Sequence, residues 1–64
     1  MNLFRIESII AIGECVLIVY HSHRLCYQFS IIDEFACAYD LPDIFYSTEA
    51  AEAEGREAIK LLSL

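Results

Sequence analysis

The residues best suited to chemistry gather in the segment 21–26, which reads His-Ser-His-Arg-Leu-Cys. Imidazole nitrogen and thiolate sulfur are ligands that zinc prefers. In a hairpin, His21 and His23 could share one face while Cys26 approaches from the returning strand. A structural zinc site usually has four ligands at recognisable spacings, and no CxxC or HxxxH pair completes this set. We therefore interpret the segment as a polar hairpin tip and expect no bound metal.

The same side chains could form a nucleophilic pair of a thiol and an imidazole. Catalysis would also require a group that orients the imidazole, an oxyanion site and a pocket. A chain of 64 residues has little room for a pocket of several hundred cubic ångströms. We expect no catalytic residue, no cofactor and no enzymatic activity.

The elements that position these residues change character at Ser47. Upstream, β-branched and aromatic residues run in stretches such as Val16–Tyr20, whereas the segment 48–62 has the composition of a helix. Strands followed by one helix indicate the α+β class. We expect one domain over residues 1–64, with an antiparallel sheet of three or four strands within residues 4–41 and a C-terminal helix over about 47–62 packed on one face.

Residues 4–12 fit either a short helix or a strand. Their four isoleucines favour the strand, because β-branched side chains suit a pleated surface. In that strand we expect Ile6, Ile10 and Ile12 to point inward. Gly13 and Glu14 then form a two-residue hairpin turn.

The next two stretches alternate between two faces. In residues 15–21, one face takes Cys15, Leu17, Val19 and His21, and the other takes Val16, Ile18 and Tyr20. Both faces are apolar, which is typical of a central strand. In residues 25–33, the core face takes Leu25, Tyr27, Phe29 and Ile31, and the face for solvent or a subunit interface takes Cys26, Gln28, Ser30 and Ile32.

A turn over residues 33–36 is expected before a short strand over 37–39. Pro42 lacks an amide hydrogen and disfavours a helical residue before it, so residues 41–43 form a connection. We expect residues 44–46 to pack as a lead-in to the helix.

The helix is expected to begin at a cap formed by Ser47 or Thr48. A helical wheel predicts one buried line of residues, flanked by Ile59 and Leu61: Ala51, Gly55, Ala58 and Leu62. Glycine inside a helix costs about 0.8–1 kcal/mol relative to alanine. Gly55 therefore indicates a close approach to a bulky sheet residue, for which Tyr27 or Phe29 is the candidate.

Hydrophobic residues make up 58% of the chain, and its mean hydropathy is +0.48. So small a domain has too little interior for all of them, and large exposed apolar patches usually mark interaction sites. We therefore predict a homodimer through the second sheet face or an edge strand. The interface candidates are Val16, Ile18, Tyr20, Tyr39 and Ile32. The alternative is that the N-terminal segment folds over this face.

The formal net charge of −6 disfavours direct binding to nucleic acid or to anionic membranes, because both require clustered lysine and arginine. In strand order alone the chain resembles small DNA-binding modules of plant transcription factors and phage integrases. Those modules read DNA with a basic sheet, and here residues 15–39 contain only Arg24 as a basic residue of that kind. The acidic residues form either a solvated rim around the core or a surface for a basic protein. They gather in two groups: Asp33, Glu34, Asp40 and Asp43 near the connections, and Glu49, Glu52, Glu54 and Glu57 on the helix.

Three cysteines without CxxC spacing indicate reduced thiols in a cytosolic setting. The apolar stretch 9–20 is too short for a membrane span, and Glu14 interrupts it. We predict a small cytoplasmic, non-enzymatic protein-interaction or regulatory module. The alternative is an acidic inhibitor or decoy that blocks a basic or nucleic-acid-binding partner. A third hypothesis is a metal- or thiol-dependent function around His21, His23 and Cys26.

Overall fold

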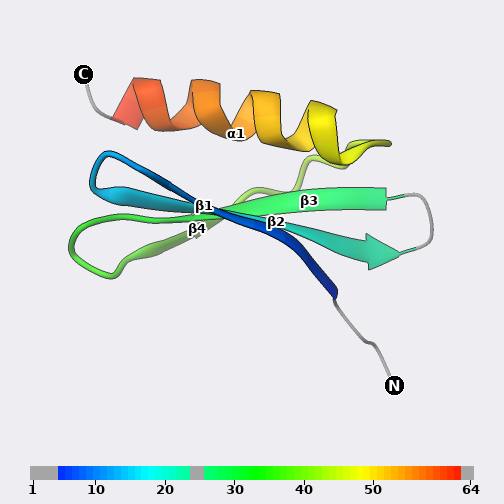
Figure 1. Cartoon of the computed structure of the whole chain (residues 1–64), viewed down its shortest axis with the longest axis horizontal. Helices are drawn as coiled ribbons and strands as arrows, with labels where there is room; N and C mark the ends of the chain where they lie inside the picture. Colours follow the sequence, from blue (N-terminus) through cyan, green and yellow to red (C-terminus); the bar gives the residue numbers. More distant parts are fainter. Residues whose placement is uncertain (1–4, 24–25, 63–64) are drawn as a thin grey trace.

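The protein is a four-stranded antiparallel sheet covered on one face by one helix (Figure 1). The computed structural model describes residues 5–23 and 26–62. The elements in chain order are β1 (Arg5–Ile12), β2 (Cys15–His23), β3 (Cys26–Ile32), β4 (Ala38–Asp40) and α1 (Thr48–Leu62). The strands lie in the order β1-β2-β3-β4, and each pairs with the next along the chain. The predicted α+β class and sheet are thus confirmed, while the expected core position of Leu25 lies outside the described residues.

The first hairpin is closed by the expected two-residue turn. Ile12 pairs with Cys15, and Gly13 between them has a φ of 60°. This left-handed conformation is open to glycine without steric cost, and a positive φ at the first turn residue matches the right-handed twist of the two strands. The turn therefore fixes the register of β1 on β2.

A bulge reverses the face of the first half of β1. Ile10 pairs with Leu17, but the register shifts between Ile6 and Ser8, and Ile6 pairs with Tyr20. An extra residue in one strand breaks the strict alternation of faces. Ile10 and Ile12 pack against the core as expected, whereas the inward position predicted for Ile6 is wrong: its exposed fraction is 57%.

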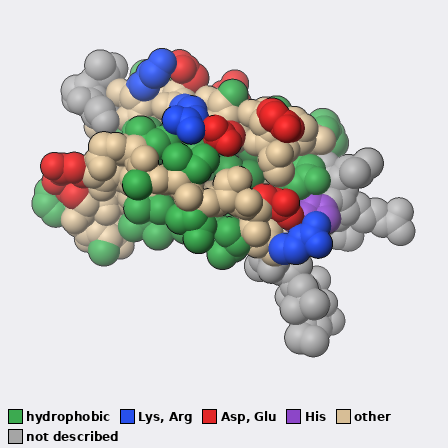
Figure 2. All heavy atoms as spheres, in the orientation of Figure 1, with side chains coloured by type: hydrophobic (Ala, Val, Ile, Leu, Met, Phe, Trp, Pro, Cys, Tyr) green, Lys and Arg blue, Asp and Glu red, His purple; other side chains and the backbone are tan. Residues whose placement is uncertain are grey.

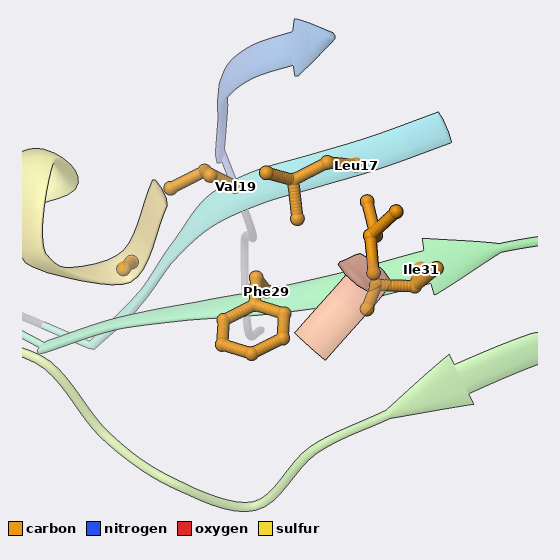
Figure 3. Packing of buried hydrophobic residues seen from close by; sticks show 6 residues of the cluster. Leu17, Val19, Phe29 and Ile31 are labelled. Atoms are coloured by element: carbon orange, nitrogen blue, oxygen red, sulfur yellow. The ribbon is translucent and has the colours of Figure 1, made fainter. Parts of the chain in front are cut away.

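The core lies between the sheet and α1 (Figure 3). Alternate side chains of β2 and β3 point to the same side, so Leu17 and Val19 meet Phe29 and Ile31 there. The helix contributes Ala51, Gly55 and Ile59, which are also buried. The buried helix line thus continues through Ile59, whereas Leu62, predicted on that line, is 49% exposed and the flanking Leu61 is 70% exposed.

Gly55 allows the helix to approach the sheet closely, as predicted. The residue it meets is Leu17, and the expected partners Tyr27 and Phe29 were wrong. A Cβ atom at Gly55 would lie 2.9 Å from Cδ2 of Leu17 and closer still to Cδ1. Leu17 is fully buried, so any shift of its side chain must be taken up by the surrounding core.

Ser47 is the N-terminal cap of α1. Its Oγ accepts a hydrogen bond from the Ala50 N–H at 3.1 Å, and its carbonyl accepts from Ala51 N–H. Glu52 and Arg56, four residues apart on the surface of the helix, form an ion pair at 2.9 Å. These local contacts set where the helix begins and which side faces water.

The segment before the helix packs through one residue only. Phe45 forms two backbone hydrogen bonds with Tyr27, and its ring stacks on Phe29 with centroids 5.8 Å apart. Ile44 is 51% exposed and Tyr46 is 79% exposed, so the expected packing of all three residues is wrong for these two. Phe45 alone anchors the end of the connection.

Candidate functional site

The described side chains of the polar hairpin at residues 21–26 do not place His21 and Cys26 together. His21 pairs with Tyr27, and the two rings lie with centroids 5.0 Å apart. Cys26 directly precedes Tyr27 in β3, so its side chain faces the side of the sheet opposite to that of Tyr27 and His21. The side chain of His23 and residues 24–25 lie outside the described part. Among the described residues, no group of three or more His, Cys, Asp or Glu side chains is arranged to hold a metal ion.

The sheet face opposite the helix carries an exposed apolar surface that the strand register defines. Residues directly opposite each other in an antiparallel pair share a face. Val16, Ile18 and Tyr20 of β2 therefore share this face with their partners on the neighbouring strands. We call it the open face, and the register assigns to it Ile6, Ile9 and Ala11 from β1, Val16, Ile18 and Tyr20 from β2, Gln28, Ser30 and Ile32 from β3, and Ala38 and Asp40 from β4.

The apolar part of the open face lies over β1 and β2. Ile9 is 63% exposed, and it pairs with Ile18, which is half-buried. In Figure 1 the helix lies on the other side of the sheet, and Figure 2 shows hydrophobic side chains along the sheet below it. Ile6, Ile18 and Tyr20 also line a shallow hollow of about 470 Å³ on this face.

The polar side chains of the open face lie on β3 and β4, and they form hydrogen bonds within the protein. Ser30 donates from its hydroxyl to a carboxylate oxygen of Asp40. The side-chain amide of Gln28 donates to the carbonyl of Leu41 at 3.4 Å. These polar side chains already have partners, which reduces the cost of covering them. A partner on the open face therefore meets an apolar half and a polar half whose hydrogen bonds are already made.

Four of the predicted interface candidates lie on the open face and one does not. Val16, Ile18, Tyr20 and Ile32 share it, as expected. Tyr39 pairs with Ile31, whose side chain is in the core, so Tyr39 belongs to the helix side of the sheet. The prediction placed it on the wrong face because a strand of three residues has too little sequence pattern to fix its pairing register.

Sequence reasoning missed Ile6 and Ile9 as members of the open face. The N-terminal segment joins the edge of the sheet as β1, so in the described residues it extends this face and does not fold over it. The bulge then brings Ile6 to the same side as Ile9. The pairing of Ile9 with Ile18 follows from the Gly13–Glu14 turn by counting back along the hairpin, and that signal was available in the sequence.

The turn between β3 and β4 is organised by Asp33. Its Oδ1 accepts hydrogen bonds from the backbone N–H groups of Phe35 and Cys37, each at 2.9 Å, and its Oδ2 accepts from the Tyr39 hydroxyl at 3.0 Å. The bond from Cys37 is the main cause that holds the pKa of Asp33 below its ordinary value. Ala36 takes a φ of 64° to close this turn.

The acidic side chains do not form one continuous surface. On the helix, Glu52 and Glu57 are ion-paired with Arg56 and Lys60. Glu34 lies beside Glu14 of the first turn, and their hydrogen bond is the main cause that raises the pKa of Glu34. Asp40 is the acidic residue that the strand pairing places on the open face. The open face is thus poor in charge compared with the helix and the turns.

Comparisons with protein-family models, with curated proteins and with solved structures find no match for this chain. No helix in the described part of the chain has the length and apolar character that crossing a bilayer requires.

Proposed function

We propose that this chain is a small, non-enzymatic protein-interaction module that self-associates as a homodimer through its open face. The observation that carries the proposal is the pair Ile9 and Ile18, which with Ile6 forms an apolar centre on a sheet face that α1 does not cover. Contiguous exposed apolar surface of this kind is the usual mark of a protein contact. Its three free cysteines fit a reducing, cytoplasmic setting.

The size of the open face suits a dimer of moderate affinity. The three long strands contain 8, 9 and 7 residues. At about 3.3 Å per residue and about 4.8 Å between strands, they cover roughly 25 Å by 15 Å. Because side chains project from each sheet, two such faces bury on the order of 1,000 Å² of accessible surface in total, which is the lower bound for specific interfaces.

The distribution of charge also permits two copies to meet. Each chain carries a net charge of −6, but the acids lie mainly on the helix and in the turns. In a face-to-face dimer both helices lie on the outside, as far apart as the fold allows. Packing two sheets through their inner faces, with strands about 30° apart, is a common arrangement for β-structure. The polar halves of the two faces then lie at the rim or against each other.

Light scattering on the purified chain, combined with one matched pair of variants, tests this proposal. We expect the wild type to have twice the chain mass of 7.3 kDa at high concentration and to dissociate on dilution. Ile9→Glu should weaken the dimer by about tenfold or more, because it buries a charge without a partner. Leu61→Glu makes the same chemical change on the exposed side of the helix and should leave the dimer intact.

The salt dependence gives a second criterion. An apolar contact between two acidic chains should hold or strengthen as salt rises from about 0.05 M to about 0.5 M, because screening weakens their mutual repulsion. A wild-type chain that stays a 7.3 kDa monomer at every concentration would reject the proposal. A dimer that Ile9→Glu leaves unchanged would place the contact elsewhere.

A further inference from the structure

A second apolar surface lies on the other side of the sheet, between β4 and the C-terminal half of α1. A four-stranded sheet is about 15–19 Å wide, whereas one helix covers about 10 Å. α1 packs on β3, β2 and β1, so the strip above β4 has no helix over it. This strip is a groove of about 630 Å³ with largely apolar walls, whose lining includes Tyr39, Leu41, Pro42, Ala58, Leu61 and Leu62, and also Asp40.

The walls of this groove explain the exposed residues at the end of the helix. Leu61 is 70% exposed and Leu62 is 49% exposed, although the wheel predicts Leu62 on the buried line and Leu61 beside it. Across the groove, the ring of Tyr39 is held in place because its hydroxyl donates to Asp33. The groove is therefore shaped before any partner arrives.

At one end the groove continues into an acidic depression of about 410 Å³. The two share Tyr39 and Leu62 as walls, and the depression adds Glu14, Asp33 and Glu34. Figure 1 shows why these acids meet: the β1–β2 turn and the β3–β4 turn lie at the same end as the C-terminus of α1. The carbonyl groups at that helix end add further negative potential.

The carboxylates in the depression favour a cation. Glu14 and Glu34 come from different turns and are held side by side, and Asp33 is kept ionised by its three donors. A positive charge placed there would relieve the repulsion between the two glutamates. The surface as a whole thus combines an apolar trough with a negative end.

We propose that the groove and the depression together bind a peptide segment of a partner protein, with apolar side chains in the groove and a lysine or arginine in the depression. This goes beyond the dimer proposed above, because it uses the helix side of the sheet and leaves the open face available. Both contacts can be made at once.

The charges of the chain argue against a second copy as the occupant. Every arginine and lysine in the described residues is ion-paired with a glutamate of its own chain: Arg5 with Glu7, Arg56 with Glu52, and Lys60 with Glu57. A second copy would also bring its own net charge of −6 to the acidic end. A basic partner matches this surface better.

Two synthetic peptides of equal length test the proposal on the full, isotope-labelled chain. Both carry the same leucine and phenylalanine core, and one ends in Lys-Arg whereas the other ends in Glu-Glu. We expect the basic peptide to bind saturably, with amide shifts centred on Tyr39 and Leu61, and the acidic peptide to bind at least about tenfold more weakly. High salt should reduce the difference between the two peptides.

Variants then assign the site. Leu61→Ser should weaken binding of both peptides, and the double change Glu14→Gln with Glu34→Gln should weaken only the basic one. All three residues are exposed, so the fold should tolerate these changes. Ile9→Glu, which targets the open face, should leave peptide binding intact.

Three results would overturn this inference. The first is equal binding of the two peptides, or no saturable binding at all. The second is loss of peptide binding in Ile9→Glu, which would move the contact to the open face. The third is a shift from dimer to monomer in Leu61→Ser, which would make the groove a contact between copies. If Ile9→Glu fails to weaken the dimer while the basic peptide still binds at Leu61, the dimer proposal alone fails.

Discussion

Gly55 and Leu17 set the distance between the helix and the sheet. The sequence alone predicts that Gly55 allows a close approach, because a mid-helix glycine between alanines has no local advantage. It does not predict that the partner is Leu17. That depends on which part of β2 lies under the helix, and the choice is made by the packing of the whole sheet.

Substitutions at Gly55 should therefore destabilise the fold even where they favour the helix. Gly55→Ala gains up to about 1 kcal/mol of helix propensity but crowds Leu17, and we expect a net loss of stability. Gly55→Leu should cost about 3 kcal/mol or more, and a loss of 1 kcal/mol lowers the Tm of so small a domain by about 4–8 °C. Thermal unfolding followed by circular dichroism measures both effects.

A double-mutant cycle with Leu17→Val is the control for this contact. The cost of Gly55→Ala should shrink when Leu17 is replaced by the smaller valine, because the crowded methyl groups are gone. Equal costs in the two backgrounds would mean that the two residues do not interact in the way described.

Asp33 should make the stability of the folded chain depend on pH in the acidic range. Its pKa is lowered in the folded chain, so its contribution is present above its ordinary pKa and is lost as the pH falls below about 4. Glu34 has a raised pKa and acts in the opposite sense, because its protonated carboxyl hydrogen-bonds to Glu14 and no longer repels it. The Tm should thus rise slightly on mild acidification from neutral pH and fall below about pH 4.

Asp33→Asn separates these two effects. It keeps an oxygen that can accept the backbone bonds of the turn but removes the titrating carboxyl. The loss of Tm below about pH 4 should be smaller in this variant than in the wild type. Parallel curves for the two proteins at every pH would show that Asp33 has no part in the acid response.

At the scale of the elements, the sequence predicts which segments form strands and where the helix begins, and it is less informative about faces. Alternation in β2 and β3 places their side chains correctly because both strands are regular there. The bulge in β1 has no clear sequence signal, since no glycine marks it, and it moves Ile6 to the open face. Tyr39 was misplaced for a similar reason, because a strand of three residues has too little pattern to fix its register.

The helix cap gives a prediction at this scale. Ser47→Ala removes the side-chain acceptor for the Ala50 N–H and should cost about 1 kcal/mol. Thr48→Ala is the matched control, because the Thr48 hydroxyl bonds only to the side chain of Glu49 among the described contacts. Chemical denaturation should show a smaller loss for Thr48→Ala. The reverse order would mean that the cap is Thr48.

At the scale of the whole molecule, one helix on a four-stranded sheet leaves two apolar surfaces. The open face follows from the sequence, because a single helix covers a single face of a sheet and the second face of β2 is apolar. The groove beside β4 does not follow from the sequence, since it depends on which strands the helix crosses. The exposure of Leu61 and Leu62 is explained only when the position of α1 over the strands is known.

The central claim is that two copies meet through the open face. Isotope-filtered NMR on a mixture of labelled and unlabelled chains tests it directly, because it detects only contacts between different copies. The claim predicts intermolecular contacts from the methyl groups of Ile9 and Ile18. Intermolecular contacts confined to Leu61 and Leu62, or none at concentrations where light scattering detects a dimer, would contradict it.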